Sequence, residues 1–137
     1  MSDSTLTKLM VVEDDDDIRS VAQVSLEAIG GFTLCLCSSG PEALEVVPVF
    51  RPQLILLDVM MPGMDGMDTL AALRKLPGSA DGHPGAAPVV FMTARVQPQE
   101  VRRYRDMGAL DVIAKPFDPM TLADTIRQIW QHHVQGA

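Results

Sequence analysis

The chain has 137 residues, of which 47% are hydrophobic, enough for one compact core and too few for two ordinary domains. Its 11 basic and 18 acidic residues give a net charge of −7, the wrong sign for a protein that neutralises the phosphates of DNA or RNA. The short polar N-terminus, and the lack of any run of about 20 apolar residues, argue against secretion and a membrane span. We therefore expect one cytoplasmic domain over residues 1–137, with its core at about 8–133 and no direct contact with nucleic acid or membrane.

Five short apolar runs predict the strands of a sheet. They lie at residues 9–12, 32–37, 54–57, 89–92 and 112–114. Segments with helical spacing separate them, and this alternation favours right-handed βαβ units around a parallel sheet covered on both faces. The expected architecture is a doubly wound (βα)5 α/β fold.

Caps and breakers predict five helices. The first helix follows the acidic run 14–17 and stops at Gly30, and the second opens at the capping-box sequence 39–42. The third spans residues 67–76, the fourth runs from Pro98 to Gly108, and the fifth opens at the pair Asp118-Pro119. Apolar residues recur at helical spacing in the first helix (Ile18, Val21, Ala22, Ile29) and in the last (Leu122, Ile126, Ile129, Trp130). Pro48 and Pro52 should shorten the second helix. The stretch 77–88, rich in Gly, Pro and Ala, should form a flexible surface loop.

Cys35 and Cys37 are the two cysteines, two residues apart on one expected strand. Their side chains would point to the same face of the sheet and cannot form an ordinary disulfide with each other. No further cysteine or nearby histidine completes a zinc ligand set. We interpret both as small packing residues.

Four of the expected strands end in residue types that suit phosphoryl chemistry. Glu13 and Asp14 follow the first strand, Asp58 the third, Thr93 the fourth and Lys115 the fifth. The carboxyl ends of the strands in an open parallel sheet form the crevice where ligands bind. We therefore expect these side chains to converge on one site.

Asp58 is the expected nucleophile of that site. We expect a carboxylate at a strand end, followed by the turn sequence Met61-Pro62-Gly63, to be held rigidly and exposed in the crevice. The alternative for Asp58 alone is a turn or helix-capping aspartate. Lys115 and the Thr93 hydroxyl could each donate to a phosphoryl oxygen and stabilise its charge.

Three converging carboxylates repel each other unless a cation lies between them. Mg²⁺ fits better than Ca²⁺ or zinc, because it keeps several waters and needs only one or two protein carboxylates besides phosphate oxygens. Asp14 and Asp58 are the expected ligands, with Glu13 beside them or acting through water and the backbone carbonyl of Met60 as a further oxygen. Residues 15–17 are interpreted as acids that stabilise a helix N-terminus, and the run does not fit an EF-hand.

These motifs together resemble the receiver domain of two-component response regulators, similar in size to the stand-alone chemotaxis regulators. The matching segments are Val11-Val12-Glu13-Asp14, the run 57–66 around Asp58, Met92-Thr93-Ala94 and Ala114-Lys115-Pro116-Phe117. The resemblance implies strand order 2-1-3-4-5, a cis bond before Pro116, and phosphorylation of Asp58 by a histidine kinase or histidine phosphotransfer protein. It also implies that a downstream protein binds the face made by the fourth helix, the fifth strand and the fifth helix.

Three positions bear on how such a domain would switch. The family usually has an aromatic residue three positions before the site lysine, where this chain has Val112. We therefore predict that Thr93 moves toward the phosphoryl group and repositions the fourth helix without an aromatic rotamer change. In the family that this chain resembles, the positions of Met60 and Arg95 flank the phosphoryl group. We predict that these two side chains obstruct the water that would hydrolyse the acyl phosphate.

Two other functions compete with a phosphorylated switch. Aspartyl-phosphate phosphatases also use a strand-end aspartate, followed two residues later by a second aspartate as general acid, but here Met60 occupies that place and cannot donate a proton. We therefore do not expect turnover of outside substrates. The other alternative is a docking module that keeps the fold and works without phosphorylation.

Overall fold

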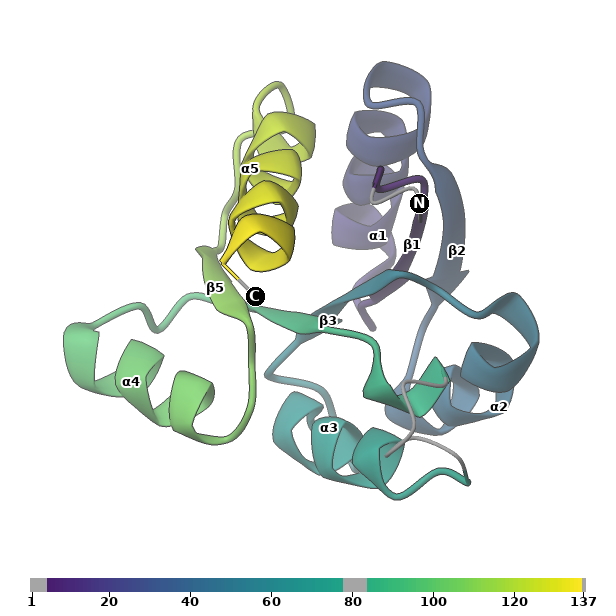
Figure 1. Ribbon diagram of the computed structural model, residues 1–137, viewed down its shortest axis with the longest axis vertical. Helices are drawn as coiled ribbons and strands as arrows, with labels where there is room; N and C mark the ends of the chain where they lie inside the picture. The colour runs from purple at the N-terminus through teal and green to yellow at the C-terminus, as the bar shows by residue number, and fades with distance from the viewer. Residues whose placement is uncertain (1–4, 78–83, 137) are drawn as a thin grey trace.

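The computed structural model describes residues 5–77 and 84–136, in which five strands form one parallel sheet between two layers of helices (Figure 1). The strands are β1 (Lys8–Val12), β2 (Thr33–Cys37), β3 (Leu54–Asp58), β4 (Val89–Thr93) and β5 (Asp111–Ala114). Their order is β2-β1-β3-β4-β5, and all neighbouring pairs are parallel. The predicted (βα)5 fold and strand order are confirmed.

Helices follow every strand and cover both faces of the sheet. They are α1 (Asp16–Gln23), continued by the π-helical turn η1 (Val24–Ile29), α2 (Gly40–Phe50), α3 (Gly66–Arg74), α4 (Pro98–Asp106) and α5 (Leu122–Gln135). A 3-10 turn, η3 (Pro84–Ala86), precedes β4. α1 and α5 lie on one face, whereas α2, α3 and α4 lie on the other (Figure 1).

The central strand β3 is buried along its whole length and shows how the two layers share the core. Leu54 and Leu56 pack with α1 and α5, while Ile55 and Leu57 pack with the helices of the opposite face. Complete burial of one such side chain stabilises the fold by roughly 1.5–3 kcal/mol. This packing fixes the strand that ends in Asp58.

The strand register brings the candidate site residues to one edge of the sheet. Val12 of β1 pairs with Leu57 of β3, so the residues that follow them, Glu13 and Asp58, lie level with each other. Strand side chains alternate between faces. Glu13 and Asp58 continue the rows that face α1 and α5, whereas Thr93 continues a row that faces α2, α3 and α4.

The expectation of one regular first helix up to Gly30 is wrong in its second half. The chain widens into η1, where the N–H of Gly30 donates to the carbonyl of Ser25 at 3.0 Å. Ser25 and Leu26 are buried in this turn. Val21 and Ile29, two members of the predicted apolar stripe, remain 40% and 48% exposed.

Pro48 does not shorten the second helix, contrary to expectation. α2 continues through Phe50, with Pro48 inside its last turn. The helix ends where Arg51 adopts the left-handed conformation (φ 56°) and its N–H donates to the carbonyl of Val47 at 2.9 Å. A proline this near the end removes one backbone hydrogen bond without breaking the helix.

The predicted capping box at the start of α2 is only half formed. The Ser39 hydroxyl accepts from the N–H of Glu42 at 3.2 Å, but the Glu42 carboxylate accepts from Ser38 instead of Ser39. A complete capping box lies at the start of α3, where Asp65 and Asp68 each accept from the other's N–H. That second box holds the segment directly after β3.

The segment before β4 is more tightly packed than its composition suggests. Residues 78–83 of the expected flexible loop 77–88 lie outside the described residues. In the described part, Gly85 and Ala87 are buried, and the Arg74 guanidinium donates to their carbonyls at 2.8 and 2.9 Å. The expected surface position is therefore wrong for Gly85 and Ala87, whose carbonyls are satisfied by the Arg74 side chain.

Two packing predictions are confirmed. Cys37 is buried, Cys35 is half-buried, and both are free thiols in the core on the α2 side. In α5 the predicted stripe faces the core, with Leu122, Ile126 and Trp130 buried against α1 and the sheet.

Candidate functional site

The site lies at the carboxyl edge of the sheet, where four strands end in polar side chains. Asp58 and Thr93 are the last residues of β3 and β4, while Glu13 and Lys115 directly follow β1 and β5. Glu13, Asp58 and Thr93 are each only 1% exposed, so the expectation that Asp58 is exposed in the crevice is wrong. The strand ends therefore hold three polar groups out of water, where each needs a partner.

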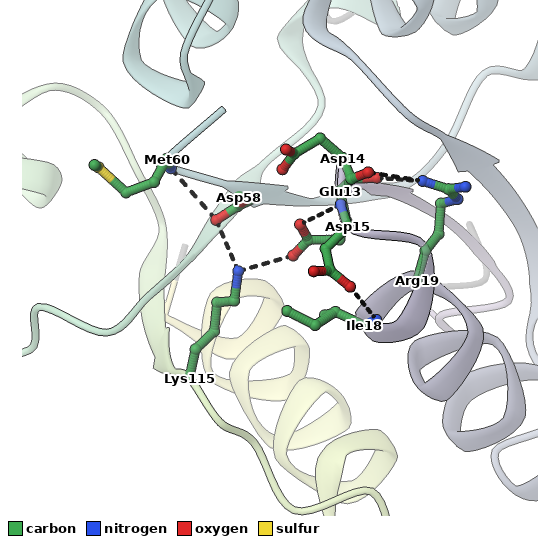
Figure 2. Close-up of polar contacts among 8 residues, drawn as sticks. All are labelled: Glu13, Asp14, Asp15, Ile18, Arg19, Asp58, Met60 and Lys115. Carbon is green, nitrogen blue, oxygen red and sulfur yellow. Dashed lines mark hydrogen bonds and ion pairs between the residues drawn. The ribbon is translucent and has the colours of Figure 1, made fainter. Parts of the chain in front are cut away.

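Lys115 is the partner of the two buried carboxylates (Figure 2). Its Nζ donates to Oε1 of Glu13 at 2.9 Å and to Oδ1 of Asp58 at 3.1 Å. The lysine side chain is 18% exposed, so its ammonium reaches the carboxylates from the mouth of the crevice. The peptide bond between Lys115 and Pro116 is cis, as the resemblance implies.

Burial sets the electrostatics of this trio. It raises the pKa of Glu13 to about 7, against the opposing hydrogen bonds from Lys115 and from the Asp15 backbone, and the charge of Asp58 adds to the rise. Burial also opposes the charge of Lys115, but its hydrogen bonds to Glu13 and Asp58 outweigh this and raise the pKa of Lys115 above its usual value. The site therefore has an excess of negative charge that one lysine only partly neutralises.

The turn after β3 fixes the position of the Asp58 carboxylate. Its Oδ1 also accepts from the N–H of Met60 at 3.3 Å (Figure 2). Gly66, the first residue of α3, packs against the Asp58 backbone, and a Cβ there would lie 2.4 Å from the Asp58 carbonyl oxygen. Only glycine permits this approach, a role that the sequence reasoning did not give to Gly66.

The acidic loop after β1 is held by its own contacts. The N–H of Asp15 donates to Oε2 of Glu13 at 3.1 Å, and the Asp15 side chain caps α1 by accepting from Ile18. The guanidinium of Arg19 donates to the Glu13 carbonyl at 2.8 Å and pairs with Asp16. The helix-capping interpretation of this run is confirmed for Asp15, whereas Arg19 was missed because a lone arginine after an acidic run has no distinctive spacing.

The same loop leaves Asp14 exposed at the rim of the crevice. Within the described residues, Glu13, Asp14 and Asp58 form the one acidic group whose ligand oxygens all lie within 4.8 Å of one another. These donors are carboxylates without histidine or cysteine, the set that a hard cation such as Mg²⁺ prefers. The residues present therefore fit the predicted cation.

Thr93 lies beside this group but is not bonded to it. Its hydroxyl accepts from the N–H of Arg95 at 3.0 Å, and its carbonyl accepts from the N–H of Lys115 at 2.9 Å. Among the described residues, no hydrogen bond joins its hydroxyl to Asp58. Of the predicted site residues, the structure thus connects Glu13, Asp58 and Lys115 directly, and it leaves the Thr93 hydroxyl with the loop that leads into α4.

The comparisons with known proteins agree with this fold and site. Residues 9–127 match the response regulator receiver domain family. The DNA-binding response regulator MtrA of Mycobacterium tuberculosis is 34% identical over 125 residues, which are 91% of this chain and 51% of that protein. The transcriptional regulatory protein CseB of Streptomyces coelicolor is 35% identical over 123 residues, which are 90% of this chain and 49% of that protein.

Among solved structures, the chemotaxis response regulator CheY4 of Vibrio cholerae superposes with a TM-score of 0.78 at 27% identity, covering 91% of this chain and 99% of that one. A response regulator from Desulfuromonas acetoxidans gives 0.77 at 27% identity, covering 91% and 97%. The chain belongs to the receiver domains of two-component response regulators. It spans about half the length of the curated relatives it matches.

In the part of the chain that the structure describes, no helix has both the length and the apolar character needed to span a bilayer.

Proposed function

We propose that this receiver domain accepts a phosphoryl group on Asp58 from a histidine kinase or a histidine phosphotransfer protein. Receiver domains as a family take phosphoryl groups from histidine kinases. The observation that supports Asp58 as the acceptor is its contact with the Lys115 ammonium at the end of the central strand. Glu13 contacts the same ammonium. In the transfer, the bond from phosphorus to the donor breaks as an Asp58 carboxylate oxygen bonds to phosphorus, and the donor leaves with the bonding pair.

Each neighbouring group has a role in this proposal. Glu13, Asp14, Asp58 and the Met60 carbonyl would hold Mg²⁺, which when bound supplies positive charge for the phosphoryl oxygens. Lys115 leaves its ion pair with Asp58 and binds a phosphoryl oxygen, while Thr93 turns its hydroxyl from the Arg95 N–H toward another. The proposed function is a switch and not an enzyme. The Met60 side chain stands where a phosphatase has its general acid and cannot donate a proton for turnover of outside substrates.

The donor would approach over the mouth of the crevice beside α1. An apolar hollow of about 440 Å³ lies there and is lined by Asp17, Ile18, Val21, Lys115, Pro116 and Phe117. Lys115 links the hollow to Asp58. A partner that buries its own apolar side chains in this hollow would bring a phosphorylated histidine next to the nucleophile.

The output face is proposed at α4, β5 and α5, and it includes Arg102, Arg103, Arg105 and Val112. The three arginines are exposed on a protein of net charge −7, and Val112 is half-buried beside them. Such a basic patch favours an acidic protein partner. Direct binding of nucleic acid is not part of the proposal for these residues, because the overall charge opposes it.

The elements from Lys8 to Gln135 pack on a single sheet, which supports one domain over these residues. The proposed location is the cytoplasm, which is typical of receiver domains.

The test is intact-protein mass measurement after incubation with acetyl phosphate and Mg²⁺. The wild type should gain one phosphoryl mass, and Asp58→Asn should gain none, because the amide is not a nucleophile. Asp124→Asn, which alters an exposed aspartate of α5, is the matched control and should be labelled like the wild type. Equal labelling of the wild type and Asp58→Asn would remove Asp58 as the acceptor, and no labelling at all would favour a phosphorylation-independent docking module.

A further inference from the structure

The chain is rich in methionine, with nine residues of this type, and they differ sharply in exposure. Met10 and Met92 are fully buried, whereas Met60, Met107 and Met120 expose 64%, 40% and 69% of their surface. A thioether must be reached by the oxidant before it can be converted to the sulfoxide. The structure therefore separates methionines that an oxidant can attack from others that it cannot.

Met60 is set apart from the other exposed methionines by its place. Its backbone N–H donates to Oδ1 of Asp58 at 3.3 Å, so the residue is anchored to the proposed phosphoacceptor. Figure 2 shows the Met60 sulfur pointing away from Lys115, at the outer end of its side chain. Met107 follows α4, at the edge of the sheet opposite the site.

The chemical state of this side chain matters to whatever is attached to Asp58. A methionine side chain has three rotatable bonds and can fold over a group that extends from its neighbour. An apolar thioether in that position obstructs the water that would hydrolyse an acyl phosphate, whereas a sulfoxide oxygen accepts hydrogen bonds from water. The two forms would have opposite effects on the lifetime of a phosphoryl group.

We propose that Met60 is an oxidation site through which peroxide shortens the lifetime of the aspartyl phosphate. The thioether sulfur attacks one oxygen of hydrogen peroxide, the O–O bond breaks, and the other oxygen leaves as water with both protons. Sulfur is oxidised by two electrons and peroxide is reduced by two. The lifetime effect rests on the proposed phosphorylation of Asp58, whereas the oxidation itself does not.

The experiment begins with the unphosphorylated protein. After brief exposure to hydrogen peroxide, peptide mass mapping should find the sulfoxide at Met60 and Met120 well before Met10 and Met92. The treated protein is then phosphorylated with acetyl phosphate and Mg²⁺, the donor is removed, and the decay of the phosphorylated mass is followed. The half-life should be several-fold shorter than in untreated protein.

Two variants separate Met60 from other effects of peroxide. Treated Met60→Leu should decay at the rate of its own untreated sample, because leucine cannot be oxidised in this way. Treated Met107→Leu should still show the shortened half-life. Treatment with methionine sulfoxide reductases should restore the wild-type half-life.

Several results would overturn the proposal. Met60 could stay reduced while Met120 is oxidised, the half-life could be unchanged although Met60 is fully oxidised, or treated Met60→Leu could lose its phosphoryl group as fast as treated wild type. If untreated wild type accepts no phosphoryl group, the proposed function itself has failed and the lifetime claim falls with it. The untreated sample therefore distinguishes the two failures.

Discussion

The crevice and the output face hold charged side chains in opposite ways. In the crevice, Glu13 and Asp58 are almost completely buried, and both contact the ammonium of Lys115. On the output face, Arg102 and Arg103 are exposed and form no ion pair with any residue that the structure describes, while Arg105 pairs with the half-buried Asp111. The charged side chains are therefore fixed by buried ion pairs in the crevice, whereas those on the output face are exposed to water.

This difference teaches where a change of charge has a large effect. A buried carboxylate that loses its partner keeps the full cost of its desolvation, whereas an exposed ion pair contributes about 0–1 kcal/mol. A phosphoryl group on Asp58 would take Lys115 from its present partners, so the disturbance begins at the fixed charges. The solvated arginines can report that disturbance to a partner but cannot cause it.

The largest expected effect lies in the connection between the two regions. Thr93 ends a strand of the crevice, and its hydroxyl accepts from the Arg95 N–H in the loop that leads to α4. If the hydroxyl turns to a phosphoryl oxygen, this loop is released and α4 shifts. Thr93→Ala should therefore abolish the amide NMR shifts across residues 96–108 that a phosphoryl mimic causes in the wild type, while Asp58 still accepts phosphate.

Val112→Ala is the control for this connection. Val112 packs from β5 against the core on the α4 side and has no ring that could rotate into it. The variant should keep the wild-type shifts. Undiminished shifts in Thr93→Ala, or their loss in Val112→Ala, would show that the signal takes another route.

A second prediction tests the metal at the crevice. Mg²⁺ bound to the folded state alone should raise the free energy of unfolding by roughly 2.7 kcal/mol at a concentration about a hundred times Kd. Asp14→Ala should lose most of this gain in thermal unfolding with and without Mg²⁺, because it removes the exposed member of the acidic group. Asp106→Ala, on the exposed end of α4, should retain the gain. Full retention in Asp14→Ala would place the metal elsewhere.

A smaller effect should follow from the protonation of Glu13 in the absence of divalent metal. The pKa of Glu13 is about 7 in the folded state, against an ordinary value of 4.5. Between these two pH values, the folded protein keeps a proton on the Glu13 carboxyl that the unfolded chain has released. The free energy of unfolding should therefore fall as pH rises from about 4.5 through 7. Glu13→Gln should flatten this part of the profile measured by urea unfolding in EDTA, and Glu45→Gln on the surface of α2 should not. An unchanged slope in Glu13→Gln would mean that other groups cause the pH dependence.

The sequence predicted the crevice better than the segments around it. Apolar strands and the residues at their ends are local features, and the geometry of a parallel sheet then requires Glu13, Asp58 and Lys115 to meet. What it did not predict depends on distant contacts. Gly66 is needed because α3 starts against the Asp58 backbone, and Arg74 orders the segment before β4 by binding its carbonyls.

The first and second helices show the same limit. A π-helical turn at the end of the first helix has no clear signature in the spacing of Val21 and Ile29, since it is stabilised by the burial of Ser25 and Leu26. Pro48 is tolerated because α2 ends two residues later, at Phe50, which the proline alone does not reveal. Both misses lie in the helical layers, away from the strand ends that carry the site.

The central claim is that Asp58, rather than Glu13 or Asp14 beside it, receives the phosphoryl group. The most direct test uses the unaltered protein: phosphorylation by acetyl phosphate with Mg²⁺, reduction with borohydride, and mass mapping of the peptides. Borohydride reduces an aspartyl phosphate to homoserine, which replaces one carboxyl oxygen by two hydrogens. We predict homoserine at position 58 and at no other aspartate. Reduction at Asp14, the corresponding alcohol at Glu13, or no reduced residue in a protein that carries the phosphoryl mass would contradict the account.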